Sequence, residues 1–109
     1  MNLNDDIYQL TESVWKQTSD SRLFKQLQDT ALGIYLNYQR HKNHKMQKHA
    51  LTDAILLSDD MRGLLKLAVQ LQAISYDDYK KWDEAAHKIV KRLITEKNIA
   101  FGTGKPNQK

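Results

Sequence analysis

The chain has 109 residues, 40% of them apolar, and its formal net charge is +4 at pH 7. This length suits a single domain, and the absence of cysteine excludes disulfides, thiolate catalysis and cysteine-based zinc sites. No run approaches the roughly 18 consecutive apolar residues of a membrane span, and the acidic segment 1–10 lacks the pattern of a signal peptide. We therefore expect a cytoplasmic protein that does not associate with a membrane.

The first predicted helix covers residues 1–18. Its apolar positions step by four, three and four residues, which is the spacing of one helix face. These positions are Leu3, Ile7, Leu10 and Val14. Asn4 or Asp5 is expected to cap the start of this helix, because their side chains accept hydrogen bonds from unpaired backbone amides.

A second helix is predicted from about Arg22 to about His41. The same spacing recurs at Phe24, Leu27, Ala31, Ile34 and Tyr38. Candidate caps precede it at Ser19, Asp20 and Ser21. Gly33 lies in its middle, where glycine costs about 1 kcal/mol relative to alanine. Either a close approach of another helix or a simple surface position would accommodate it.

The third helix is predicted from about Gln47 to about Gln72, after a connection that we place near Asn43. Its apolar residues populate more than one face, which is wider than packing against a single partner requires. Either a central place in a bundle or an interface between subunits would explain this width.

The fourth helix is predicted from about Tyr76 to about Ile99. Ser75 has the chemistry of its N-cap, and Asp78 stands three residues later, as in a capping box. Ile74 and Tyr79 flank the cap at the spacing of a hydrophobic staple.

Four amphipathic helices joined by short turns predict an all-α fold, an antiparallel up-down-up-down four-helix bundle. We expect residues 1–101 to form this single domain. Residues 102–109 carry glycine, proline and lysine, and we expect them to form a disordered basic tail.

No motif in the chain predicts catalysis. The histidines at positions 41, 44 and 49 lie among lysines, without the carboxylate that a metal site would add. The pair Glu84 and His87 matches half of a bundle di-metal motif, but no second copy exists. We therefore expect no catalytic residue, no metal and no cofactor; a metal-using bundle enzyme is the least favoured alternative.

The charge distribution is more informative than the total charge. Residues 40–49 carry four Lys/Arg and no acid, and residues 88–109 carry six Lys/Arg against Glu96 alone. In the predicted topology the second and fourth helices run parallel, so both basic runs should meet at one end of the bundle. A cluster of this kind binds phosphates in a salt-dependent, largely sequence-independent way. The candidate nucleic-acid-binding residues are Arg40, Lys42, Lys45, Lys48, Lys88, Lys91 and Arg92.

The third and fourth helices also carry a family resemblance. The relevant residues are Leu64-Leu65-Lys66-Leu67-Ala68, Ile74-Ser75-Tyr76-Asp77-Asp78-Tyr79 and Ile89-Val90-Lys91-Arg92-Leu93. This order resembles the accessory variability determinant (Avd) proteins of diversity-generating retroelements and the bundle proteins encoded by intervening sequences of 23S rRNA. After Leu93 the chain has Ile94-Thr95-Glu96, where family members often have Gly-Gly-Trp.

The resemblance implies a four-helix protomer, assembly into a homopentamer, and a basic surface that contacts nucleic acid and a reverse transcriptase. Two readings of the function therefore remain. The first is a non-enzymatic accessory protein that binds RNA or DNA and partners a retroelement reverse transcriptase. The second is a protein-binding or structural adaptor whose basic end only keeps the bundle soluble.

Overall fold

The computed structural model describes residues 2–17, 21–43 and 48–101 of the chain. These residues form four helices and contain no strand. The helices are α1 (Leu3–Trp15), α2 (Arg22–Asn43), α3 (Lys48–Gln70) and α4 (Tyr76–Phe101). The predicted tail, residues 102–109, lies outside the described residues. None of the helices in the described ranges is both long enough and apolar enough to cross a membrane.

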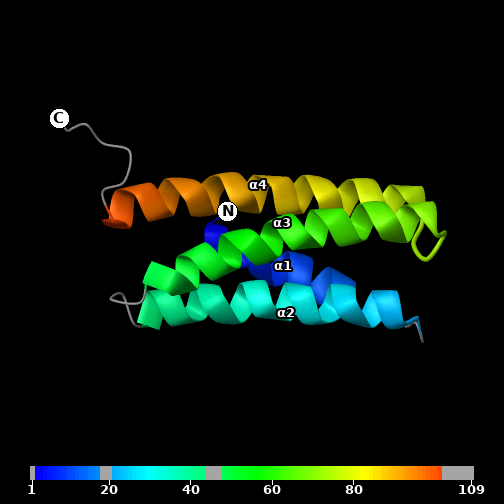
Figure 1. Ribbon diagram of the computed structural model, residues 1–109, viewed down its shortest axis with the longest axis horizontal. Helices are drawn as coiled ribbons and strands as arrows, with labels where there is room; N and C mark the ends of the chain where they lie inside the picture. The colour runs from blue at the N-terminus through cyan, green and yellow to red at the C-terminus, as the bar shows by residue number, and fades with distance from the viewer. Residues whose placement is uncertain (1, 18–20, 44–47, 102–109) are drawn as a thin grey trace.

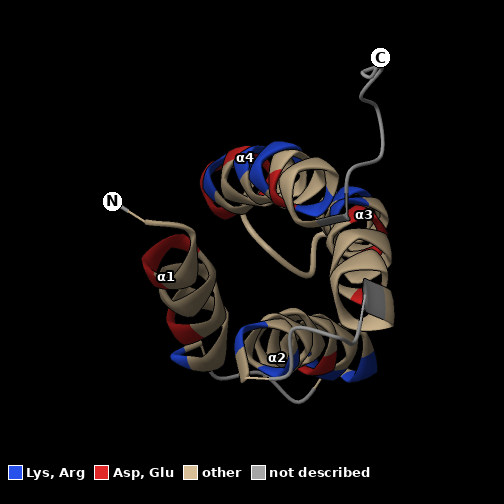
Figure 2. Ribbon diagram, turned by 90° about the vertical axis from the view of Figure 1, so that its left-hand side faces the viewer, with Lys and Arg blue, Asp and Glu red and all other residues tan. Residues whose placement is uncertain are grey.

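Successive helices run in opposite directions along the bundle (Figure 1). Each helix packs against its two neighbours in the ring: α1 and α3 both contact α2 and α4. Viewed along the bundle, the four helices surround one core (Figure 2). The predicted all-α bundle with up-down-up-down order is therefore confirmed.

The helix starts follow side-chain caps, with one correction to the prediction. Asn2, rather than Asn4 or Asp5, caps α1: its Oδ1 accepts a hydrogen bond from the Asp5 amide at 2.8 Å. The helix therefore begins at Leu3, and Asp5 lies in its first turn, where a negative charge complements the helix dipole. The predicted range 1–18 is too long at its C-terminal end, since α1 ends at Trp15.

Two serines cap α2 and α4, as the sequence predicts. The Ser21 hydroxyl accepts a hydrogen bond from the Phe24 amide at 3.4 Å. The Ser75 hydroxyl accepts one from the Asp78 amide at 3.0 Å. Both serines thereby satisfy an amide that the first helical turn would otherwise leave unpaired.

The C-terminal end of α3 lies two residues before the predicted end at Gln72. Gln72 has a φ of 60°, the left-handed conformation that terminates a helix. The Ala73 amide donates to the Ala68 carbonyl at 2.8 Å, and the Gln72 amide donates to the Val69 carbonyl at 3.1 Å. These are the two hydrogen bonds of a Schellman motif, formed here without the usual glycine.

The core consists of one apolar stripe from each helix. The stripe on α1 holds all four predicted positions, and Trp82 of α4 is among the largest side chains in the core, with 1% of its surface exposed. Ser58 is fully buried in the stripe of α3, where its hydroxyl donates to the Ala54 carbonyl at 2.8 Å. The other side of α3 leaves Leu56 and Leu67 exposed, and Leu71, directly after the helix, is exposed as well.

Gly33 marks a close approach between α2 and α3. A Cβ added at Gly33 would lie 2.9 Å from Cδ1 of Leu57, which is closer than carbon atoms pack. Of the two explanations left open by the sequence, helix–helix contact is therefore the correct one. Gly63 in α3 differs, because a Cβ there meets no described atom within 4 Å.

This contrast predicts unequal contributions to stability from the same substitution at the two glycines. Gly63→Ala should raise the free energy of unfolding by about 1 kcal/mol, because alanine favours the helix and nothing obstructs its methyl group. Gly33→Ala should gain less, since the Leu57 side chain must move. Urea denaturation of both variants measures the difference, and an equal gain at Gly33 would contradict the observed contact.

Candidate functional site

The helices α2 and α4 end at the same end of the bundle (Figure 1). We call this the basic end, defined by Arg40 and Lys42 of α2 and by Lys91 and Lys97 of α4. The C-terminal turn of α2 and the C-terminal half of α4 therefore lie at the same end of the bundle, although the two helices occupy opposite corners of the ring and do not pack against each other.

On α2, Arg40 and Lys42 are both exposed. Arg40 Nη1 donates to Oδ1 of Asn37 at 3.2 Å, and Lys42 Nζ lies 5.8 Å from the ring centroid of Tyr38. Both side chains therefore stay exposed despite these contacts. Lys45 lies outside the described residues, and the structure does not describe the side chain of Lys48.

On α4, the three predicted residues have three different environments. Lys91 is exposed on the outer side of the helix. Lys88 is also exposed, but it lines a groove between α4 and α1. Arg92 is partly buried, and its Nη1 forms an ion pair with Oδ2 of Asp6 in α1. Arg92 therefore helps to hold α1 against α4, and much of its charge is neutralised there.

A buried polar network joins α2 to α4 at the basic end. The Tyr38 hydroxyl donates to Oε1 of Glu96 at 3.2 Å, and Nε2 of His41 lies 3.0 Å from Oε2 of the same carboxylate. His41 is only 7% exposed, and its ring lies 6.1 Å from that of Tyr38. This network fixes the register of the two helices.

The register shows which cations lie level with one another. Because His41 contacts Glu96, the end of α2 lies level with Glu96 and Lys97. Lys91 lies about 7.5 Å and Lys88 about 12 Å further back along α4. Lys97 is therefore nearer to Arg40 and Lys42 than Lys88 is, although we did not select it from the sequence. Only the pairing of His41 with Glu96 reveals its position.

The same network changes the titration of a tyrosine. Burial, followed by the charge of Glu96 and its hydrogen bond, raises the pKa of Tyr38 to about 12. Each of these causes disfavours the phenolate, because the phenolate would lose its hydration and lie beside a carboxylate. Tyr38 is therefore a neutral donor throughout the physiological range.

Neither candidate metal motif gathers ligands in the described part of the chain. His41 is buried against Glu96, His49 is exposed at the start of α3, and His44 is not described. No group of three His, Cys, Asp or Glu residues that could hold a metal ion occurs among the described residues.

Of the second motif, Glu84 and His87, only His87 contributes to an ion-pair cluster between α3 and α4. Arg62 of α3 pairs with Asp83, with Nε 2.9 Å from Oδ1, and its Nη1 lies 2.9 Å from Nδ1 of His87. The Asp83 carboxylate raises the pKa of Arg62. This cluster binds one helix to another, and the sequence offered no signal for it.

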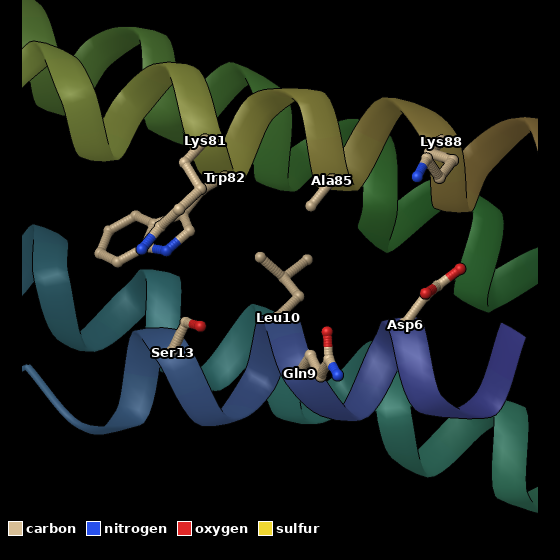
Figure 3. A pocket seen from close by; sticks show the side chains of 8 residues that line it. All are labelled: Asp6, Gln9, Leu10, Ser13, Lys81, Trp82, Ala85 and Lys88. Carbon is tan, nitrogen blue, oxygen red and sulfur yellow. The ribbon is translucent and has the colours of Figure 1, made fainter. Parts of the chain in front are cut away.

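A groove between α1 and α4 is a concave feature that involves the predicted residue Lys88. Its cavity of about 220 Å³ is lined by residues of both helices (Figure 3). They are Asp6, Gln9, Leu10, Ser13, Lys81, Trp82, Ala85 and Lys88. Apart from Lys88, none of these was selected from the sequence as a site residue.

Comparison of the chain with protein-family models, with curated proteins and with solved structures found no match in any of the three. The interpretation of the site therefore depends on its own geometry and charge.

The Tyr38 network predicts a stability loss at alkaline pH. The pKa of Tyr38 is 10.0 as the ordinary value, which applies to the unfolded chain, and about 12 in the folded protein. The neutral Tyr38 hydroxyl therefore contributes its full stabilisation of the fold below pH 10. This contribution is expected to disappear as pH rises through about 12. Chemical denaturation at several pH values should show the decline in the unmodified protein and a smaller decline in Tyr38→Phe.

Phenolate absorbance provides the matching control. The titration of the unmodified protein should contain a step near pH 12 that Tyr38→Phe lacks and that Tyr76→Phe, at an exposed position, retains. A late step that survives Tyr38→Phe would assign the raised pKa to another residue.

Proposed function

We propose that this protein is a non-enzymatic accessory protein that binds RNA or DNA through its basic end, largely without sequence preference. The observation that carries the proposal is the common direction of α2 and α4, which brings Arg40, Lys42 and Lys91 to one end of the bundle. All three side chains are exposed, so each can reach a phosphate at little cost in desolvation.

Two acids near the basic end are already engaged by partners. Asp6 is paired with Arg92, and Glu96 is contacted by His41 and Tyr38. Asp5 in the first turn of α1 and Asp53 near the start of α3 are exposed. These two carboxylates and the exposed cations together determine the field that an approaching polyanion meets.

The family resemblance is the basis for proposing a protein partner and an oligomeric state. By that resemblance the protein cooperates with a retroelement reverse transcriptase and assembles as a homopentamer. Leu56 and Leu67 of α3 support an assembly surface, together with Leu71 just after the helix, because exposed leucines favour burial against another chain. Light scattering is expected to give the mass of five chains, and a monomer at all concentrations would count against the resemblance.

The second candidate function is a protein-binding adaptor. A specific observation favours it: Tyr8 and Trp15 of α1 and Leu32 and Leu36 of α2 are all exposed large apolar side chains. Trp15 Nε1 donates to the Gln28 carbonyl at 3.1 Å, so these two helices are in register along that side. Such a surface suits a protein partner better than a polyanion.

A charge-neutralising variant distinguishes the two functions. The triple variant Arg40→Gln, Lys42→Gln and Lys91→Gln should weaken binding of generic single-stranded RNA or DNA about tenfold or more at low salt. It should also reduce the slope of log K against log salt by about 2, because roughly 0.7 counterions are released for each phosphate contact on a single strand. Arg92 is left intact, since its loss would leave Asp6 unpaired.

The matched control removes the same charge elsewhere. Lys25→Gln, Lys66→Gln and Lys80→Gln are exposed substitutions away from the basic end, and together they should change the slope much less. Gel shifts over a salt series measure both triple variants. Absence of binding by the unmodified protein at low salt would reject nucleic-acid binding and leave the adaptor function.

A further inference from the structure

The groove between α1 and α4 has an apolar floor and polar ends. Leu10 and Ala85 face each other across its middle, with Trp82 and Ser13 toward one end and Asp6 and Lys88 toward the other (Figure 3). Its cavity of about 220 Å³ is smaller than the usual pocket for a drug-sized ligand. A ligand of the groove is therefore a small molecule or one unit of a polymer.

Donor groups dominate the polar lining. Ser13, Lys81, Lys88 and Gln9 form no side-chain hydrogen bond or ion pair with any residue that the structure describes. Lysine ammonium groups only donate, and the hydroxyl and the amide can donate. The lining is thus suited to a ligand rich in acceptor oxygens.

Trp82 provides an independent observation at the same place. The side chain is 1% exposed, and its Nε1 has no hydrogen-bond partner among the described residues. Buried polar groups in folded proteins are nearly always paired, so an unpaired indole N–H beside a cavity indicates an acceptor there. Because the indole and the Ser13 hydroxyl lie toward the same end of the groove, one anionic group can contact both.

The charge of the groove is also positive. Asp6 is the one acid in the lining, and its carboxylate is already paired with Arg92. The charges of Lys81 and Lys88 remain uncompensated within the described residues. They stand two helical turns apart on α4, about 10.5 Å along the axis.

We propose that this groove is a binding site for a phosphate ester. The phosphate oxygens accept hydrogen bonds from Lys81, from the Ser13 hydroxyl and from Trp82 Nε1, while the body of the ester lies on Leu10 and Ala85. Phosphate suits the donors better than a carboxylate does, because it accepts from several directions and lysine binds it as a point charge.

This site does not require the basic end to bind nucleic acid. The ester can be a free nucleotide or one phosphate of a single strand, and the chemistry at Lys81, Ser13 and Trp82 is the same in both. Lys88 is the residue that the groove shares with the candidate nucleic-acid-binding set.

The indole resonance of Trp82 gives a direct test. The chain has two tryptophans, so ¹⁵N-labelled protein should show two indole N–H resonances, and Trp15→Phe identifies the one from Trp82. Three probes are titrated at constant ionic strength: inorganic phosphate, uridine 5′-monophosphate and a short oligothymidylate. The Trp82 resonance should shift saturably with one site per chain, while that of Trp15 stays in place.

Two neighbouring lysines provide the matched variants. Lys81→Gln should weaken binding about tenfold, whereas Lys80→Gln, which removes the same charge from the exposed side of α4, should leave binding unchanged. Ser13→Ala should weaken binding a few-fold with an unchanged melting temperature. This last variant tests the groove without altering net charge.

The outcomes separate the sources of the phosphate and can reject the site. Saturable binding of the monophosphate supports a free phosphate ester, and binding of the oligothymidylate alone supports a strand backbone. No saturable shift with any probe would overturn the proposal, as would an equal loss from Lys80→Gln. Loss of oligothymidylate binding in the basic-end triple variant, with monophosphate binding retained, would show that the two surfaces act separately.

Discussion

The arrangement of this bundle depends on a mismatch in helix length. α1 has 13 residues and packs against α4, which has 26. A helix of half the length cannot cover its neighbour, so the side of α4 toward α1 is only partly buried. The ion pair of Asp6 with Arg92 and the groove beside Lys88 both lie along this incomplete contact.

Polar contacts also fix α4 at the start of α1. Near Leu3, which lines the same hollow, Glu96 reaches across the bundle to Tyr38 and His41 on α2. The Glu96 side chain is 33% exposed, and each of its two oxygens has one of these residues as a partner. The network therefore sets the register of two helices that do not otherwise pack together.

The sequence predicted the local features well because they depend on residues within one or two turns. The apolar stripes, the caps at Ser21 and Ser75 and the order of the helices need only the helical period and short-range hydrogen bonds. The cap at Asn2 was missed because Asn4 and Asp5 have the same chemistry and lie only two or three residues away. The predicted end of α3 at Gln72 lies two residues too far along the chain, because the left-handed conformation of Gln72 carries no sequence signal without glycine.

The contacts within the candidate site could not be predicted in the same way, because the residues that form them are far apart in the chain. Asp6 and Arg92 are separated by 86 positions, and Tyr38 and Glu96 by 58. Which cations are neutralised depends on the register of packed helices, and periodicity does not determine that register to within a turn. In the sequence, Lys91 and Arg92 are two adjacent cations that nothing distinguishes. In the structure, Arg92 holds α1 in place through Asp6, whereas Lys91 faces solvent.

Lys88 connects the two proposed surfaces and limits how independent they can be. It lines the groove and stands about 4.5 Å along the helix axis from Lys91 of the basic end. An anion bound in the groove lowers the positive potential that a polyanion meets at Lys91. Binding at either surface must therefore weaken binding at the other by the same factor, because coupling between two equilibria is reciprocal. Screening at physiological salt, over a Debye length of about 8 Å, reduces that factor without removing it.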